Sequence, residues 1–442
     1  MGGMALARRA HTASGVAALV ALTAVGLGAA ASRTTRGEPE RRRQAAYLAQ
    51  APARRAALLA SLVNPDNAYG RLRRAHYATG AAGDWDRLRP WNPRVAPVMH
   101  AGEQRRPAET SARLSALPIG DETRLPSDAE LAALGESAFF RYPAQLAPAT
   151  PYLLGDDAAA RYGLWVDRDR GLGGLVRAEM ADGTTRIAFT CATCHADVVA
   201  GRLVVGSASG KLDVGRMIVD ANGGIATPAP LRNFLSWGAG RVDVTTTDGS
   251  VPERIADLRP VRWLQHLQYD ATVRHADEVD LAIRIETLIV TAHSQTIRPP
   301  RVVSLALAWF IRDLSRDLPA LPGSNAAGAS TFRRRCAGCH DGPGLSGPPQ
   351  PLEAVGTDPV LGESADRGTG TYRVASLRGV GSRPSLFHDG SLSGLEALFD
   401  PARLDPAYRN GAHGPGAVRG HAFGLDLPAD ERRALIAYLQ RL

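Results

Sequence analysis

The pattern of hydrophobic and polar residues predicts several helices and one β-hairpin. The segment 127–140 (SDAELAALGESAFF) starts with a helix-capping serine, has Glu130 three residues later and continues with an apolar stripe, which is typical of a helix with a capping box. The segment 175–190 (LVRAEMADGTTRIAFT) places an Asp-Gly pair between two strand-like runs and predicts a hairpin. Two apolar runs that each follow a proline, 305–312 and 434–441, predict further helices.

The amino end has the pattern of an export signal. Arg8 and Arg9 precede an apolar run of small residues, 14–30, and the alanines at 29–31 offer a cleavage site of the A-x-A kind. The run is short for a membrane span and poor in Leu, Ile and Phe. We therefore expect a periplasmic or otherwise extracytoplasmic protein, whose residues 1–31 are either a cleaved signal peptide or an uncleaved membrane anchor.

The net charge of +8 does not indicate a nucleic-acid partner. Residues 1–56 contain nine Arg and two Glu, which supply seven of the eight net charges, so the rest of the chain is close to neutral. Binding to nucleic acid needs a basic patch on the folded domain. The length of 442 residues is enough for two or three domains with cores of their own.

All four cysteines lie in two copies of the motif C-x-x-C-H. Thiols three residues apart on a helical turn can both reach the vinyl groups of one porphyrin, and the histidine can bind its iron. Tetrahedral zinc needs four ligands where each motif supplies three, and a redox dithiol does not need the histidine. The motifs therefore predict two covalently bound haem c groups. Their members are Cys191, Cys194 and His195 in the first copy and Cys336, Cys339 and His340 in the second.

The chain after the first motif repeats itself. The segment 258–270 (LRPVRWLQHLQYD) aligns with 377–389 (LRGVGSRPSLFHD), and the run 305–312 aligns with 434–441. The same order of elements in both halves predicts two related domains. The expected fold class is mainly α, with two tandem cytochrome c-type domains, a small β-hairpin in the first and an N-terminal extension. The expected boundaries are 1–31 for the signal peptide or anchor, 32–126 for the extension, 127–322 for the first haem domain and 323–442 for the second.

With these motifs, the chain resembles the bacterial di-haem cytochrome c peroxidase superfamily over residues 127–442. The segment 374–400 (VASLRGVGSRPSLFHDGSLSGLEALFD) looks like that family's Leu-Arg-Asn-Val…His-Asp-Gly loop, and 420–442 (GHAFGLDLPADERRALIAYLQRL) is similar to its di-haem rubber-oxygenase branch. The resemblance implies that the second domain relays electrons to the first haem, which meets peroxide or oxygen when active. Relatives also hold calcium between their domains, although the sequence shows no evident ligands for it here.

Two departures from the family pattern concern the site residues. The family peroxidases place a methionine after His-Asp-Gly as the sixth ligand of the second haem, but the matching position near Ala402 is not Met, and no Met follows Met217. The second domain must then use another ligand. The family's catalytic glutamate segment is not found either, so no catalytic residue is assigned.

Histidines are the remaining candidates for the sixth ligands. Of His388, His413 and His421, we expect His421 to bind the second haem, because it matches the branch in which a histidine replaces the peroxidase methionine. The repeat register places His293 fifteen residues before Ala308, much as His421 lies sixteen before its counterpart. His293 is therefore a candidate ligand of the first haem, and the alternative is a polar loop residue that leaves the iron open.

Four further residues are expected around the haems. In the repeat, Tyr269 aligns with His388 and Arg259 aligns with Arg378. The resemblance places His388 near the haem propionates, and the two arginines are suitable propionate partners. Tyr269 is either a contact between the haems, a propionate donor or an ordinary half-buried core residue.

These observations predict an exported redox protein that passes electrons from its second haem to its first. Three destinations stay open: reduction of hydrogen peroxide at an open first haem, electron relay between partners with two six-coordinate haems, and oxygen activation like that of the rubber oxygenases. The electron donor expected is a small redox protein or a quinol-linked cytochrome.

Overall fold

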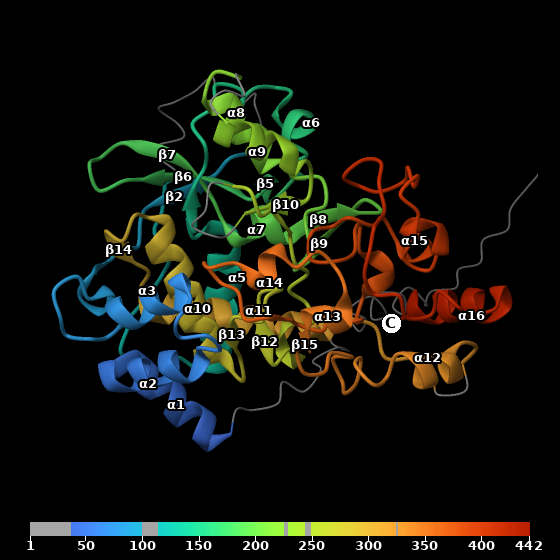
Figure 1. Cartoon of the computed structure of the whole chain (residues 1–442). Helices are drawn as coiled ribbons and strands as arrows, with labels where there is room; N and C mark the ends of the chain where they lie inside the picture. The colour runs from blue at the N-terminus through green and yellow to red at the C-terminus, as the bar shows by residue number, and fades with distance from the viewer. Residues whose placement is uncertain (1–36, 100–113, 225–228, 244–248, 324–325) are drawn as a thin grey trace, which may run out of the picture.

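The structure is a computed structural model, and it describes residues 37–99, 114–224, 229–243, 249–323 and 326–442 (Figure 1). The predicted export segment 1–31 lies outside these residues. In the described part of the chain, no helix is both long enough and apolar enough to cross a membrane.

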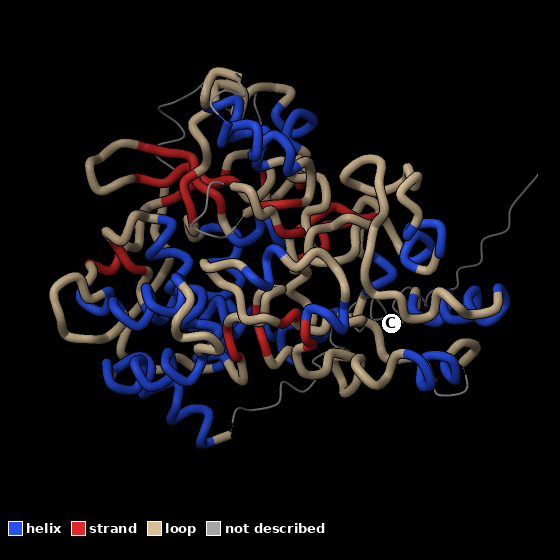
Figure 2. Tube along the Cα trace, viewed as in Figure 1, coloured by secondary structure: helices blue, strands red, loops and turns tan. Residues whose placement is uncertain are grey.

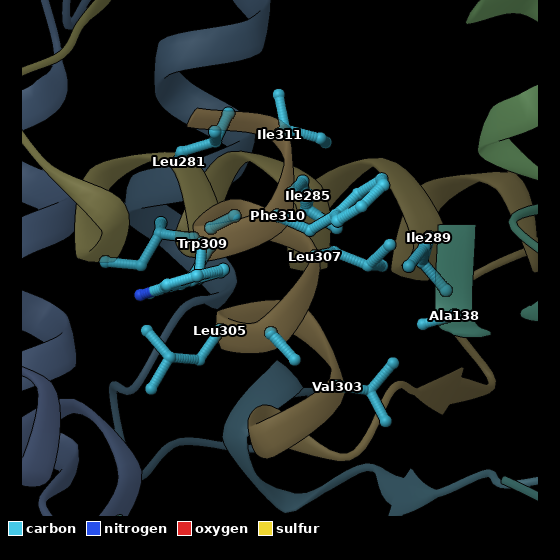
Figure 3. Packing of buried hydrophobic residues seen from close by; sticks show 14 of the residues in the cluster. Ala138, Leu281, Ile285, Ile289, Val303, Leu305, Leu307, Trp309, Phe310 and Ile311 are labelled. Atoms are coloured by element: carbon cyan, nitrogen blue, oxygen red, sulfur yellow. The ribbon is translucent and has the colours of Figure 1, made fainter. Parts of the chain in front are cut away.

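Three helices form the centre of the molecule: α5 (Asp128–Arg141), α10 (Glu278–Ala292) and α11 (Arg301–Asp313). Their apolar faces interlock, and Figure 3 shows side chains of α5, α10 and α11 filling the space between them. The helices α5 and α11 touch so closely that a Cβ on Gly135 would lie 2.2 Å from the carbonyl oxygen of Ala306. The predicted helix at 127–140 is confirmed, including the reciprocal capping box of Ser127 and Glu130.

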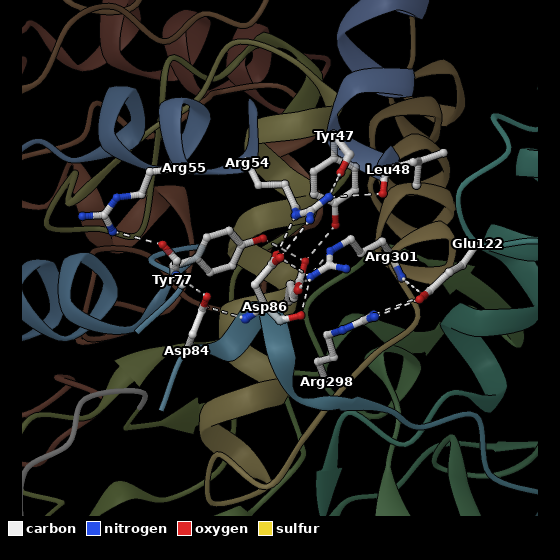
Figure 4. Close-up of polar contacts among 12 residues, drawn as sticks. Tyr47, Leu48, Arg54, Arg55, Tyr77, Asp84, Asp86, Glu122, Arg298 and Arg301 are labelled. Carbon is white, nitrogen blue, oxygen red and sulfur yellow. Dashed lines mark hydrogen bonds and ion pairs between the residues drawn. The ribbon is translucent and has the colours of Figure 1, made fainter. Parts of the chain in front are cut away.

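The N-terminal helices α1 (Glu38–Ala49), α2 (Ala51–Ser61) and α3 (Ala68–His76) pack against this centre. Buried polar contacts connect the two parts (Figure 4). The hydroxyls of Tyr47 and Tyr77 donate to the carboxylate of Glu286 at 3.0 and 2.9 Å, and Arg54 and Arg301 both bind Asp86. The extension therefore shares one core with the residues that follow it.

The sequence predicted a mainly α fold of two cytochrome c-type domains, and this prediction is wrong. The described residues form a mixed fold with 39% helix and 13% strand, the strands lie in several small sheets, and no cytochrome domains emerge (Figure 2). The predicted hairpin is present as β6 (Leu175–Glu179) and β7 (Thr185–Phe189), but it belongs to a four-stranded sheet of order β2-β6-β7-β3. The outer strands of that sheet are β2 (Val95–Pro97) and β3 (Gln145–Leu146).

The other strands of the described residues pair in two-stranded sheets. These short strands explain why the prediction of a mainly α fold was wrong. Most are only two residues long, too short for an alternating pattern to be recognised. One pair, β1 with β14, joins segments about 200 residues apart in the sequence. The pairs are β1 (Arg89–Pro90) with β14 (Ile297–Arg298), β4 (Val166–Asp167) with β5 (Gly171–Leu172), β8 (Ala196–Val199) with β9 (Arg202–Val205), β10 (Arg241–Val242) with β11 (Glu253–Arg254), β12 (His266–Leu267) with β13 (Val273–Arg274), and β15 (Gln350–Pro351) with β16 (Thr371–Tyr372).

The carboxyl-terminal part has its own small apolar core, in which Phe332 and Leu435 are buried. There α12 (Ala329–Arg335) packs on α16 (Ala429–Leu439), so the predicted closing helix is confirmed to within a few residues. The shorter helices are α6 (Ala158–Tyr162), α7 (Cys191–His195), α8 (Val214–Ala221), α9 (Ala229–Trp237), α13 (Leu352–Val355), α14 (Val360–Glu363) and α15 (Leu395–Leu398).

Candidate functional site

The second C-x-x-C-H motif forms a tight turn directly after α12. The backbone N–H groups of Cys339 and His340 both donate to the carbonyl of Cys336, at 3.1 and 2.9 Å. One turn thus carries both thiols on one side, as attachment to a single ring requires. The two cysteines and His340 line a cavity of about 240 Å³.

The cavity has the chemical character of a site for a flat apolar ring that carries negative charge. Most of its wall is apolar, and four arginines but no Asp or Glu belong to the described residues that line it. Arg335 is paired with Asp426, which does not line the cavity, and the other arginines favour an anionic ligand. The apolar lining includes Val355, Leu386, Phe387, Leu395, Leu398, Phe399 and Leu439, and the arginines are Arg254, Arg335, Arg373 and Arg383.

His340 and His421 face each other across this cavity. Their ring centres are 6.3 Å apart, and the ring planes meet at 59°. Two imidazoles that bind one metal ion from opposite sides, each at about 2.0 Å with its ring centre about 1.1 Å behind the nitrogen, have centres about 6.2 Å apart. The observed separation therefore suits one iron atom between the two rings.

Both rings are held in the neutral form that binds metals. Nδ1 of His340 is 3.1 Å from the carbonyl oxygen of Leu345, which leaves Nε2 for the cavity. Burial and the neighbouring His340 lower the pKa of His421 to about 4. Nδ1 of His421 is buried and has no hydrogen-bond partner among the described residues.

The loop that carries His421 is fixed by a buried arginine. Arg403 is fully buried and donates to the carbonyls of Leu398, Val418, Gly420 and His421 at 2.7–2.9 Å. The N–H of His421 donates to Val355 at 2.6 Å. His421 also has a φ of +45°, a conformation that costs a non-glycine residue free energy and recurs at functional sites.

Three of the cavity arginines gather around Tyr269. The guanidinium groups of Arg254 and Arg373 each lie 5.4 Å from the centre of its ring. Arg383 is buried, its two terminal nitrogens donate to the carbonyls of Ser376 and Arg378 at 2.6 and 2.7 Å, and its Nε has no partner in the described part of the chain. The hydroxyl of Tyr269 also lacks a partner there. Together these groups form a set of donors at one part of the cavity wall, suited to the carboxylates of a haem.

The sequence did not point to these arginines, and the two that it suggested, Arg259 and Arg378, have other partners in this structure. Arg259 is bound to the carboxylate of Asp257 at 2.5 Å. Arg378 donates to backbone carbonyls of the loops at 319 and 343 and lies over the ring of Trp263. Neither side chain lines the cavity. No sequence motif identifies the arginines that line the cavity, because they come from three separate segments of the chain.

His388, which the resemblance places near the haem propionates, lines this cavity. Its ring stacks on Tyr372, with ring centres 4.5 Å apart and 23° between the planes. Burial lowers its pKa, so the ring is a neutral donor or acceptor at the cavity wall.

The first C-x-x-C-H motif forms the short helix α7 (Cys191–His195). The hydroxyls of Thr190 and Thr193 fix it by donating to the carbonyl of Gly174, at 2.8 and 3.2 Å. Nδ1 of His195 is 2.9 Å from the carbonyl of Ala256, the same arrangement as in the second motif. Burial raises the pKa of both cysteines to about 12, so neither is a reactive thiolate.

Among the described residues, no contact joins His293 to His195. It caps the end of α10, its Nε2 is 3.2 Å from the carbonyl oxygen of Pro143, and its ring packs edge-on against Trp91 with centres 4.9 Å apart. Binding of iron through Nε2 would require this contact to break.

One short segment connects the two motifs. The N–H of Arg254 donates to the carbonyl of His388 at 2.7 Å, and the Arg254 side chain lines the second cavity. Two residues later, Ala256 holds His195. Two residues of extended chain span about 7 Å, so the backbone offers a short covalent path between the two sites.

Neither a scan against protein-family profiles nor a search of curated proteins finds a match to this chain. Within the described ranges, no group of three or more His, Cys, Asp or Glu side chains is arranged to hold a metal ion.

Proposed function

We propose that this chain is an exported redox protein with two covalently bound haem c groups, one at each C-x-x-C-H motif, and that electrons pass from the second site to the first. One observation carries the proposal. His340 and His421 face each other at 6.3 Å across an apolar, arginine-lined cavity whose wall contains both cysteines of the motif.

The residues present fit a haem at the second motif in three ways. Cys336 and Cys339 lie on one turn beside the cavity. The buried Nδ1 of His421 and Nε of Arg383 lack partners among the described residues. The wall offers cations but no anions for the two propionates. A bound anionic ring would provide counter-charge for the cations of the wall, which are costly to bury without it.

A haem bound there supplies a one-electron couple between ferric and ferrous iron. The protein contributes two neutral imidazoles, and a second histidine in place of methionine lowers the reduction potential of the iron. The apolar wall excludes water from the ring. Arg254, Arg373 and Arg383 offset the charge of the propionates and keep them from being buried unpaired.

The fate of the electron depends on the first site. We favour reduction of hydrogen peroxide there, because His293 is engaged by Pro143 and Trp91 and so leaves the position opposite His195 without this ligand. The alternatives are an electron carrier, in which His293 moves to the iron, and an oxygenase acting on an apolar substrate. The donor proposed is a small redox protein or a quinol-linked cytochrome outside the cytoplasmic membrane.

Electron paramagnetic resonance of the oxidised, exported protein tests the proposal. We expect one low-spin signal from the second site and one high-spin signal from the first. The variant His421→Ala should convert the low-spin signal to high spin, whereas His413→Ala, a loop histidine bound to the carbonyl of Asp389, should change neither. Two low-spin signals of which one is lost on His293→Ala would instead support the electron carrier. A protein without haem would refute all three functions.

A further inference from the structure

Two buried carboxyl groups lie directly behind the wall of the second cavity. Glu253 precedes the cavity residue Arg254, and Asp270 follows the cavity residue Tyr269. Glu253 is 3% exposed and Asp270 is fully buried. In each, one oxygen, Oε1 of Glu253 and Oδ2 of Asp270, has no hydrogen-bond partner in the described part of the chain. A buried carboxylate oxygen without a donor favours a carboxyl group that carries a proton.

The two carboxyl groups interact with each other and with a mixed set of charges. Asp270 raises the pKa of Glu253, as Asp243 does, while Arg284 and Arg367 lower it. Arg367 and Arg284 also lower the pKa of Asp270, and Asp366 raises it. Among the described residues, Arg373 also interacts with both carboxyl groups, and Tyr69 and Tyr372 interact with Asp270. Arg254, at the cavity wall, is the chain neighbour of Glu253.

Burial has the largest effect on both groups and outweighs the arginines. The pKa of Glu253 is raised to about 8 and that of Asp270 to about 7. Close carboxyl groups that share a dry site titrate as a pair, because the second ionisation must occur beside the charge of the first. The pair can therefore bind or release a proton near neutral pH when the charge in its surroundings changes by a small amount.

If the proposed function holds, the charge inside the cavity changes in this way. Haem propionates bound beside Arg254 and Arg373 bring negative charge to the wall that the pair lies behind, and an electron adds one more. A nearby negative charge favours the protonated form of a carboxyl group. Arg373 connects the two places, since it interacts with Tyr269 at the cavity wall and with both Glu253 and Asp270.

We propose that Glu253 and Asp270 form a proton-binding pair that takes up one proton from solvent when the second site accepts one electron, and releases it when the electron leaves. The electron comes from a reduced one-electron donor protein and the proton from water, so the charge of the site stays constant. This inference rests on the proposed function, and it adds to it a pH-dependent control of the electron affinity of the second site.

The sign of the effect follows from linkage. The reduced protein binds more protons than the oxidised protein wherever the pair titrates, so the reduction potential of the second site falls as pH rises through neutrality. A full coupling of one proton to one electron changes the redox equilibrium tenfold per pH unit, which is about 59 mV. Above the pKa of the pair in the reduced state, the potential no longer depends on pH.

Potentiometric titration of the haem-loaded protein between about pH 6 and 9 tests the proposal. We expect the pH dependence of the second site to move to lower pH in Glu253→Gln and in Asp270→Asn, because the remaining carboxyl loses the charge of its partner, and to be lost in the variant that carries both changes. It should be unchanged in Glu353→Gln, which removes an exposed carboxylate on α13 beside the same cavity. A potential without pH dependence in the unmodified protein, or a slope that the double variant retains, would overturn the proposal.

Infrared difference spectra of the unmodified protein give a second reading that does not depend on the variants folding. Reduction with dithionite should add a band of protonated carboxylic acid, and its absence would overturn the proposal. Haem content, measured on the same sample, separates this failure from failure of the proposed function. A protein that binds two haems but shows neither signal loses only the proton-binding pair.

Discussion

The guanidinium of Arg403 donates to the carbonyl oxygen of His421 at 2.9 Å and to three carbonyl oxygens that come before His421 in the sequence. A residue without contact to the cavity thus holds the loop of the proposed ligand. Because His421 has a positive φ, the loop stores strain that these hydrogen bonds must offset.

Replacing Arg403 should release this loop. We expect Arg403→Leu to lower the free energy of unfolding by about 3 kcal/mol, since several buried carbonyls lose their donor. It should also turn the low-spin signal of the second site into a mixture of low and high spin. Chemical denaturation and paramagnetic resonance measure the two effects. Arg409→Leu, an exposed arginine of the same region, is the control and should leave both unchanged.

The proposed sixth ligand predicts a change in potential. His421→Met should raise the reduction potential of the second site, because a thioether favours ferrous iron over ferric iron. Potentiometry of the haem-loaded variant measures it. A potential that stays at the value of the unmodified protein would show that residue 421 is not a ligand.

The cavity arginines predict a change of the opposite sign. Arg383→Met removes a buried positive charge beside the cavity, which should destabilise the reduced state by about 1–2 kcal/mol for a charge several ångströms away. The potential of the second site should therefore fall. Arg378→Met is a matched control, because Arg378 lies five residues earlier but does not line the cavity. An equal fall in both variants would speak against the proposed position of the propionates.

A buried histidine outside the sites predicts the acid sensitivity of the fold. Burial lowers the pKa of His275 to about 4, below the value of an unfolded histidine. The unfolded chain then binds more protons between the two pKa values, so stability falls as pH drops from neutrality. We expect a loss of about 2 kcal/mol between pH 7 and pH 5. Urea denaturation should show most of this loss absent in His275→Gln.

The local elements could be predicted from the sequence where their determinants are local. Ser127 and Glu130 fix the start of α5 through contacts three residues apart, and an Asp-Gly turn joins β6 and β7. The two-residue strands have no such determinants. Pairs such as Arg89 with Ile297 depend on how the central helices bring distant segments together, and this is why the expectation of a mainly α fold was wrong.

The candidate site was predictable to a similar extent. The thiols and the histidines proposed to bind iron beside them are close in sequence, and the absence of a methionine after Met217 made His421 a candidate ligand. Arg254, Arg373 and Arg383 were missed, because the cavity takes them from separate segments, and their sequence neighbours give no sign of it. The repeat register suggested Arg259 and Arg378 instead, but alignment to a repeat does not show which way a side chain points.

The mass of the denatured, exported protein tests the central claim most directly. Thioether bonds survive unfolding, so the account predicts a chain that carries two haem groups, and the double variant Cys336→Ser/Cys339→Ser should carry one. A denatured chain without any added haem, or a variant whose haem content equals that of the unmodified protein, would contradict the account.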